Sequence, residues 1–203
     1  MKTDRTKQTG KKTQALIEGA LMVALGYVLS VIPFFSMPTG GSVTLLSTLP
    51  IVMFSLRRGG RWGVAAASLY AFIQALQGVS NILFCQTLGA MLLCFLLDYY
   101  LAYAFLGFAG PLARLPKNRW LGLLAGVLVT GFARFACSFL SGIVLWGSYA
   151  PEGAPVWHYS AVYNASWCGP DVALVLAAVL LMYKVQPGLF MPAPAGNGRP
   201  ASA

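Results

Sequence analysis

Long apolar runs alternate with short polar segments along almost the whole chain. A run of about 20 apolar residues is long enough to cross the hydrocarbon core of a bilayer as a helix. Hydrophobic residues make up 58% of the chain and charged residues only 9%, which excludes an ordinary soluble domain. The sequence therefore predicts an all-α integral membrane protein, and 203 residues leave room for about six spanning helices.

Six candidate spans can be placed between the polar and Gly/Pro-rich breaks. They cover residues 15–32, 43–56, 62–77, 85–108, 120–145 and 158–183. We expect residues 1–14 to form a basic tail and residues 15–184 to form a single transmembrane domain. Residues 185–203 are rich in Pro, Gly and Ala, a composition that predicts a disordered tail.

The basic residues predict the orientation of these spans. Lys and Arg lie in the N-terminal tail, at positions 57–61 and 114–119, and at Lys184, whereas the other three connections contain neither residue. The positive-inside rule then places both termini in the cytoplasm. Because the net charge of +9 is divided among these short clusters, it indicates topology and not nucleic-acid binding.

Two acidic residues are predicted to lie deep in the membrane. Asp98 and Asp171 each follow about 13 residues of a predicted span, which at 1.5 Å per residue places them near the bilayer middle. A charge there costs ~2.5 kcal/mol or more, so each acid needs a partner. Arg134 can pair with either one, and if it pairs with Asp171, Asp98 is free to face a ligand. Glu18 lies near the cytoplasmic headgroups, where snorkelling explains it.

Aromatic side chains gather around the outer ends of the last two spans. They are Trp146, Tyr149, Trp157, Tyr159, Tyr163 and Trp167. An interfacial aromatic belt explains part of this group, but Trp167 lies deeper, beside Asn164. One carboxylate, several aromatic faces and an amide suit a flat cationic heterocycle, which cation–π contacts and hydrogen bonds would hold.

Other chemistries have little support. The chain has no P-loop motif, and its single histidine, His158, cannot build a histidine metal site. The cysteines at positions 85, 94, 137 and 168 form no C-x-x-C pair and fit the role of small buried hydrophobic residues, although a bridge between Cys85 and Cys137 stays open. We therefore expect no enzyme active site, no metal and no cofactor.

The first predicted span carries small residues at a spacing of four. The pairs are Ala15/Gly19 and Ala20/Ala24. Such pairs let another helix approach closely. The pattern fits packing inside the protein's own bundle and docking of a partner subunit equally well.

Several short motifs stand out along the spans. They are Leu56-Arg57-Arg58-Gly59, Asp98-Tyr99 followed by Phe105 to Gly110, Arg134, Phe139-Leu140-Ser141-Gly142, and Trp146-Gly147-Ser148-Tyr149-Ala150-Pro151. With six predicted spans and no ATPase motif, they resemble the substrate-binding (S) subunit of energy-coupling-factor (ECF) vitamin transporters. The resemblance is greatest to the thiamine-specific subunit and covers most of residues 15–184.

The resemblance implies a six-helix S component in the cell membrane of a bacterium. Such a subunit captures thiamine outside and releases it inward when docked on a transmembrane coupling subunit that carries two ATPases. Ala20 and Ala24 match the docking motif of the family. The positions that match the family pocket are Asp98, Tyr99, Ser138, Trp146, Tyr159 and Asn164.

Three positions depart from the family pattern. Asp98 stands where the family has Glu, Ser138 stands where it has His, and Phe34 and Phe35 are the candidates to replace a missing tryptophan. The first two changes alter the size and the hydrogen bonding of the expected pocket. The alternative ligand is therefore a hydroxymethylpyrimidine-type thiamine precursor or another cationic heterocycle, and the alternative function is that of a stand-alone secondary transporter.

Overall fold

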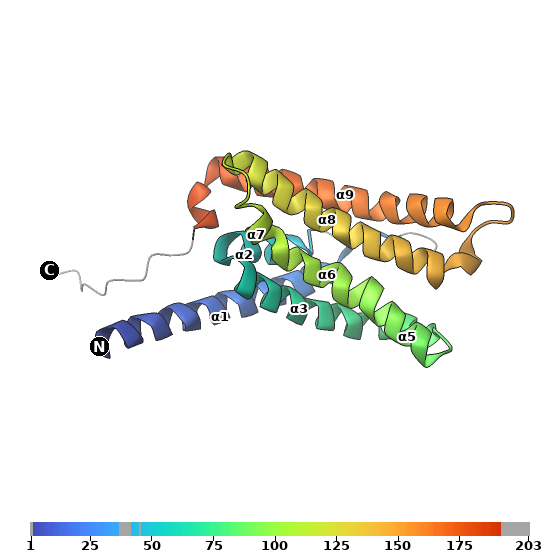
Figure 1. Ribbon diagram of the computed structural model, residues 1–203, viewed down its shortest axis with the longest axis horizontal. Helices are drawn as coiled ribbons and strands as arrows, with labels where there is room; N and C mark the ends of the chain where they lie inside the picture. Colours follow the sequence, from blue (N-terminus) through green and yellow to red (C-terminus); the bar gives the residue numbers. More distant parts are fainter. Residues whose placement is uncertain (1, 37–41, 45, 192–203) are drawn as a thin grey trace.

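The computed structural model describes residues 2–36, 42–44 and 46–191, and over them the chain is an elongated helical bundle (Figure 1). The helices are α1 (Lys2–Ser30), α2 (Leu49–Arg58), α3 (Gly60–Gln77), α4 (Val79–Phe84), α5 (Leu88–Cys94), α6 (Ala102–Ala104), α7 (Ala109–Leu112), α8 (Arg119–Val144) and α9 (Val156–Val185). The start of α1 and the end of α9 lie at one end of the molecule (Figure 1). The α8–α9 connection lies at the other end.

The last two helices form an antiparallel pair along the length of the bundle (Figure 1). The Asn118 side chain accepts a hydrogen bond from the Trp120 amide at 2.9 Å and so caps the start of α8. The connection to α9 contains a single 3-10 turn, η3 (Gly147–Tyr149). Helix α9 continues through Pro170, a residue that membrane helices tolerate when neighbouring groups satisfy the freed carbonyl.

The fourth predicted span is a continuous helical run of changing pitch. After α5 comes a π-helical segment, η1 (Phe95–Leu101), then α6, a 3-10 segment, η2 (Phe105–Phe108), and α7. A π-helical segment widens the helix locally, and such segments are frequent at functional sites. Here it contains Asp98 and Tyr99, two of the predicted pocket residues.

Four helical stretches are long and apolar enough to cross a membrane, namely Thr9–Ser30, Leu88–Leu112, Arg119–Val144 and Val156–Val185. They correspond to the first, fourth, fifth and sixth predicted spans. The helix in the second predicted span, α2, is only ten residues long. The helix in the third predicted span, α3, has 18 residues, but its mean hydropathy is lower than that of the four long apolar stretches.

The structure corrects the sequence analysis in three places. The fold is all-α as predicted, but the first connection is not a plain loop, because β1 (Pro33–Ser36) and β2 (Ser42–Thr44) pair there as a short antiparallel hairpin. The predicted loop at 78–84 is mostly the helix α4. The predicted disordered tail begins with an ordered 3-10 turn, η4 (Pro187–Phe190), whose Phe190 is buried; the tail from residue 192 lies outside the described residues.

The hydrophobic core lies where α2 packs against α3, α7, α8 and α9. Its largest fully buried side chains are Phe54 and Tyr70, together with Ile51, Leu56 and Leu123. This core is nearer to the end that holds the termini.

Candidate functional site

A cavity of about 560 Å³ opens between η1, α6, α8 and α9. Its volume is within the range of about 300–1,000 Å³ that is typical of small-molecule sites. The lining residues are Ser80, Asn81, Phe84, Asp98, Tyr99, Tyr103, Arg134, Ser138, Gly142, Trp146, Tyr149, Tyr159, Ser160, Tyr163, Asn164 and Trp167. Aromatic rings and polar groups thus form most of the wall.

Asp98 lies on the wall of the cavity with its side chain held in place by neighbours. Its Oδ2 accepts hydrogen bonds from Ser141 Oγ at 2.6 Å and from Trp146 Nε1 at 3.0 Å. Cys94 Sγ, one helical turn earlier, lies 3.6 Å from the same oxygen. None of these three donors carries a charge, and among the described residues no Lys or Arg pairs with Asp98. The carboxylate is therefore oriented but not neutralised by a protein cation.

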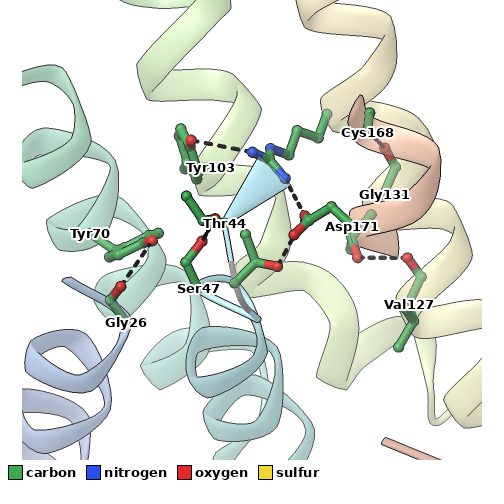
Figure 2. Close-up of polar contacts among 12 residues, drawn as sticks. Gly26, Thr44, Ser47, Tyr70, Tyr103, Val127, Gly131, Cys168 and Asp171 are labelled. Carbon is green, nitrogen blue, oxygen red and sulfur yellow. Dashed lines mark hydrogen bonds and ion pairs between the residues drawn. The ribbon is translucent and has the colours of Figure 1, made fainter. Parts of the chain in front are cut away.

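Arg134 and Asp171 form a buried ion pair between α8 and α9. Arg134 Nη1 lies 2.6 Å from Asp171 Oδ2, and Thr48 Oγ1 donates to the same oxygen at 3.4 Å. Figure 2 shows Asp171 and Tyr103 on opposite sides of this network, with Tyr103 reaching the guanidinium group. Of the two pairings that the sequence leaves open, the structure has Arg134 with Asp171.

Aromatic rings surround the guanidinium group and the mouth of the cavity. The Arg134 guanidinium carbon lies 4.7 Å from the Tyr103 ring centre and 4.9 Å from that of Trp167. The Phe84 and Trp146 rings stack with centres 6.2 Å apart. Stacked pairs of this kind offer flat faces to a planar ring. A second stack lines the α9 side, between Tyr159 and Tyr163.

The α8–α9 contact beside the cavity depends on a small residue. A Cβ atom added at Gly142 would lie 2.2 Å from Ser160 Oγ and 3.2 Å from Asn164 Nδ2. This close approach lets Asn164 Nδ2 donate to the Ser138 carbonyl at 3.2 Å and to the Ser160 carbonyl at 2.9 Å. The Asn164 side chain is therefore fixed between the two helices.

All six predicted pocket residues line the same cavity, namely Asp98, Tyr99, Ser138, Trp146, Tyr159 and Asn164. The side chains of Phe34 and Phe35 lie outside the described part of the chain. The four cysteines are free, so the bridge between Cys85 and Cys137 is not formed.

Sequence reasoning missed several residues of the site. Tyr103 follows Tyr99 by four residues, a spacing that puts both on one side of the helix and was a usable signal. Ser141 belongs to the motif Phe139-Leu140-Ser141-Gly142, but its hydrogen bond to Asp98 was not predicted. Ser80, Asn81 and Phe84 belong to the segment expected to be a loop; Asn81 Nδ2 donates to the Tyr99 hydroxyl at 3.1 Å. No pattern in the sequence places α4 against the cavity.

The two small-residue pairs of α1 face different environments. Ala15 and Gly19 are buried within the bundle, whereas Ala20 and Ala24 are exposed. Packing inside the bundle therefore explains only the first pair. Snorkelling is the wrong explanation for Glu18, because its carboxylate pairs with Arg57 and Arg58.

Comparison with known proteins adds an independent line of evidence. The family model described as "Thiamine transporter protein" matches residues 16–191. The chain belongs to the thiamine transporter family. The match extends from within α1 to the end of η4, so the cavity, both candidate docking positions and the ordered start of the tail all lie in the family domain.

Individual members of the thiamine transporter family agree with this assignment. The thiamine transporter ThiT of Bacillus subtilis is 32% identical over 190 residues, which cover 88% of this chain and 95% of that protein. ThiT of Lacticaseibacillus paracasei is 28% identical over 191 residues, which cover 91% and 94%. The solved structure of ThiT from Listeria monocytogenes superposes with a TM-score of 0.73 at 25% identity, over 90% of this chain and all of that one. The family resemblance seen in the sequence motifs is confirmed.

Proposed function

We propose that the chain is the thiamine-binding S component of an ECF importer in a bacterial cell membrane. It would capture thiamine from outside and release it inward when docked on a transmembrane coupling subunit with two ATPases. The proposal includes six membrane-crossing segments, with α2 and α3 as the two short ones, and cytoplasmic termini. It assigns no catalytic residue, no metal and no cofactor to the chain.

The proposal rests on the charged residues that line the cavity and on their partners. Of the acidic and basic side chains Asp98 and Arg134 on the cavity wall, Arg134 is paired with Asp171, so Asp98 is the carboxyl group left without a protein counter-charge among the described residues. Thiamine is a singly charged cation in which a methylene bridge joins two flat rings, a positively charged thiazolium and an aminopyrimidine. Its positive ring can rest on the aromatic faces, and its aminopyrimidine can donate hydrogen bonds to Asp98.

The proposed binding residues have different roles. Asp98 receives the aminopyrimidine, with Ser141 and Trp146 orienting its carboxylate. Tyr99 on η1 and Tyr159 on α9 offer aromatic rings, while Ser138 on α8 and Asn164 on α9 are buried polar groups of the lining. The relatives named as thiamine transporters make thiamine the first ligand to test.

The topology has two supports. The basic clusters at 57–61 and 114–119, together with Lys184, fall on connections or helix ends on the side of the termini. The α8–α9 connection at the opposite end carries a single acidic residue, Glu152, and no basic one. The positive-inside rule puts the first side in the cytoplasm, so the cavity opens outward.

Substitution of Asp98 and Trp146 tests the pocket. Hydrogen bonds to a charged group contribute about 1.5–3 kcal/mol, so Asp98→Asn is expected to weaken thiamine binding about 10- to 100-fold. Trp146→Ala removes both an aromatic face and a donor to Asp98, and we expect a loss of the same order. The measurement is calorimetric titration of detergent-purified protein, with an unchanged gel-filtration profile as evidence of folding.

Glu152→Gln is the matched control, because Glu152 is an exposed acid in the α8–α9 connection and lies outside the cavity lining. If Asp98→Asn and Trp146→Ala both bind thiamine with wild-type affinity, the proposed pocket is wrong. Transport of thiamine into liposomes by the purified chain alone would instead favour a secondary transporter.

A further inference from the structure

Glu18 of α1 joins two arginines of α2 in a single ion-pair cluster. Its Oε1 lies 2.6 Å from Arg57 Nε, and its Oε2 accepts from Arg58 Nε at 2.8 Å and also from Arg58 Nη2. The three side chains are between 8% and 20% exposed. Ion pairs that are partly buried and share several hydrogen bonds hold their geometry better than solvent-exposed pairs.

The same cluster reaches the C-terminal end of the described chain. Arg57 Nη1 donates to the Leu189 carbonyl at 2.9 Å. Leu189 belongs to η4, which folds back against α2 and α9 and buries Phe190 in the core. Glu18 therefore ties α1 to a point where α2 and the segment after α9 are already fixed.

Helix α1 is also held by contacts with α2 and α3, where Gly26 and Ser30 each share a hydrogen bond with α3. It lies at the edge of the bundle, beside α2 and α3 and on the side away from α9 (Figure 1). Between residues 9 and 30 its buried positions are Ala15, Gly19, Val23 and Gly26, none larger than valine. A Cβ atom at Gly19 would lie 3.0 Å from Phe54, so the helix rests closely on α2 there. These small side chains let α1 approach its neighbours closely. In the described part of α1, the ion pairs with α2 come from Glu18.

The exposed pair Ala20 and Ala24 begins beside this cluster. With 1.5 Å per residue, the two alanines lie about 3 Å and 9 Å beyond Glu18 along the helix axis. A rotation of α1 that broke the Glu18 contacts would turn Ala20 and Ala24 by the same angle. The ion pairs therefore contribute, together with the packing of Gly19 and Gly26, to the direction in which the two alanines face.

We infer that Glu18 is a positioning residue whose ion pairs with Arg57 and Arg58 set the orientation of the Ala20/Ala24 face for the coupling subunit. The proposal rests on the proposed docking function but not on the identity of the vitamin. Glu18 contacts neither the cavity nor its lining residues. It would act on transport and leave ligand binding intact.

Amide hydrogen exchange of the purified protein tests the positioning directly. In Glu18→Gln the loss of the charge pairs should make the amides of residues 15–30 exchange about tenfold faster, while exchange in α8 and α9 stays unchanged. The exposed acid Glu152, replaced by Gln, is the control and should alter neither region. Unchanged exchange in α1 of Glu18→Gln would overturn the inference.

Transport assays test whether the position of α1 affects uptake. Glu18→Gln should keep thiamine affinity within about twofold of wild type but reduce uptake by the assembled transporter about tenfold. The charge exchange Glu18→Arg with Arg58→Glu keeps one acid and two bases in the cluster and should restore most of the uptake. An equal loss of binding and uptake in Glu18→Gln, or no rescue by the exchange, would contradict the positioning role.

The two proposals fail in different ways. If wild-type protein does not bind thiamine, the proposed ligand is wrong, but the exchange measurement on α1 still decides whether Glu18 holds the helix. If thiamine binds and Glu18→Gln transports normally, the S-component function stands and the role of Glu18 is rejected.

Discussion

Asp98 and Asp171 occupy similar depths of predicted spans but have different surroundings. Asp171 lies against Arg134, whereas Asp98 lies on the cavity wall with the neutral donors Ser141 and Trp146. The cost of a charge inside a membrane predicts from sequence that both acids need partners. It does not predict which acid takes the arginine, because that choice depends on how α8 packs against α9 and on the π-helical turn around Asp98.

The Arg134–Asp171 pair yields a prediction at the residue scale. Asp171→Asn would leave a buried guanidinium without a counter-charge, which costs about 3–5 kcal/mol, so the variant should unfold at a clearly lower temperature in detergent. The double variant Arg134→Met with Asp171→Leu removes both charges and should recover much of this loss. Thermal unfolding of the two variants beside Glu152→Gln checks this. A single variant that melts like wild type would show that the pair contributes little to stability.

Helices α1 and α5–α7 show what an apolar run predicts and what it does not. Hydropathy predicts both as spans, and the structure has candidate spans over Thr9–Ser30 and Leu88–Leu112. It does not predict the π-helical and 3-10 segments inside the second run, since a run that is apolar almost throughout has no periodicity that distinguishes one helix type from another. The hairpin β1/β2 was missed because its few residues resemble any Gly/Pro-rich connection.

The two faces of α1 yield a prediction at the element scale. Ala20→Trp and Ala24→Trp each place a large ring on the exposed face of α1, where a partner helix would need close approach. Thiamine binding should stay within about twofold of wild type, because α1 contributes no side chain to the cavity. Uptake by the assembled transporter should fall about tenfold or more.

Ala173→Trp is the matched control for this experiment, since Ala173 is an exposed alanine on α9. It should leave both binding and uptake close to wild type. Normal uptake in Ala20→Trp and Ala24→Trp would mean that the coupling subunit does not use this face.

At the scale of the whole molecule, the sequence predicts the membrane class and the family, and the family is confirmed by the comparison with known proteins. Both can be predicted because apolar runs and local motifs consist of consecutive residues. The six predicted pocket residues line one cavity, and their role in binding stays a prediction. The arrangement of the pocket depends on contacts between distant segments, such as α4 with the Tyr99 hydroxyl and Gly142 with Ser160. Contacts between distant segments produce no periodic pattern in the sequence, so they cannot be predicted from it.

The proposed function depends on the binding of thiamine in this cavity. Its most direct test is calorimetric titration of the detergent-purified wild-type protein with thiamine, with a hydroxymethylpyrimidine precursor as the parallel titrant. We expect submicromolar thiamine binding together with quenching of tryptophan fluorescence, because Trp146 and Trp167 line the cavity. Binding of the precursor alone would assign the cavity to a different ligand, and the absence of heat with either compound would contradict the proposed function.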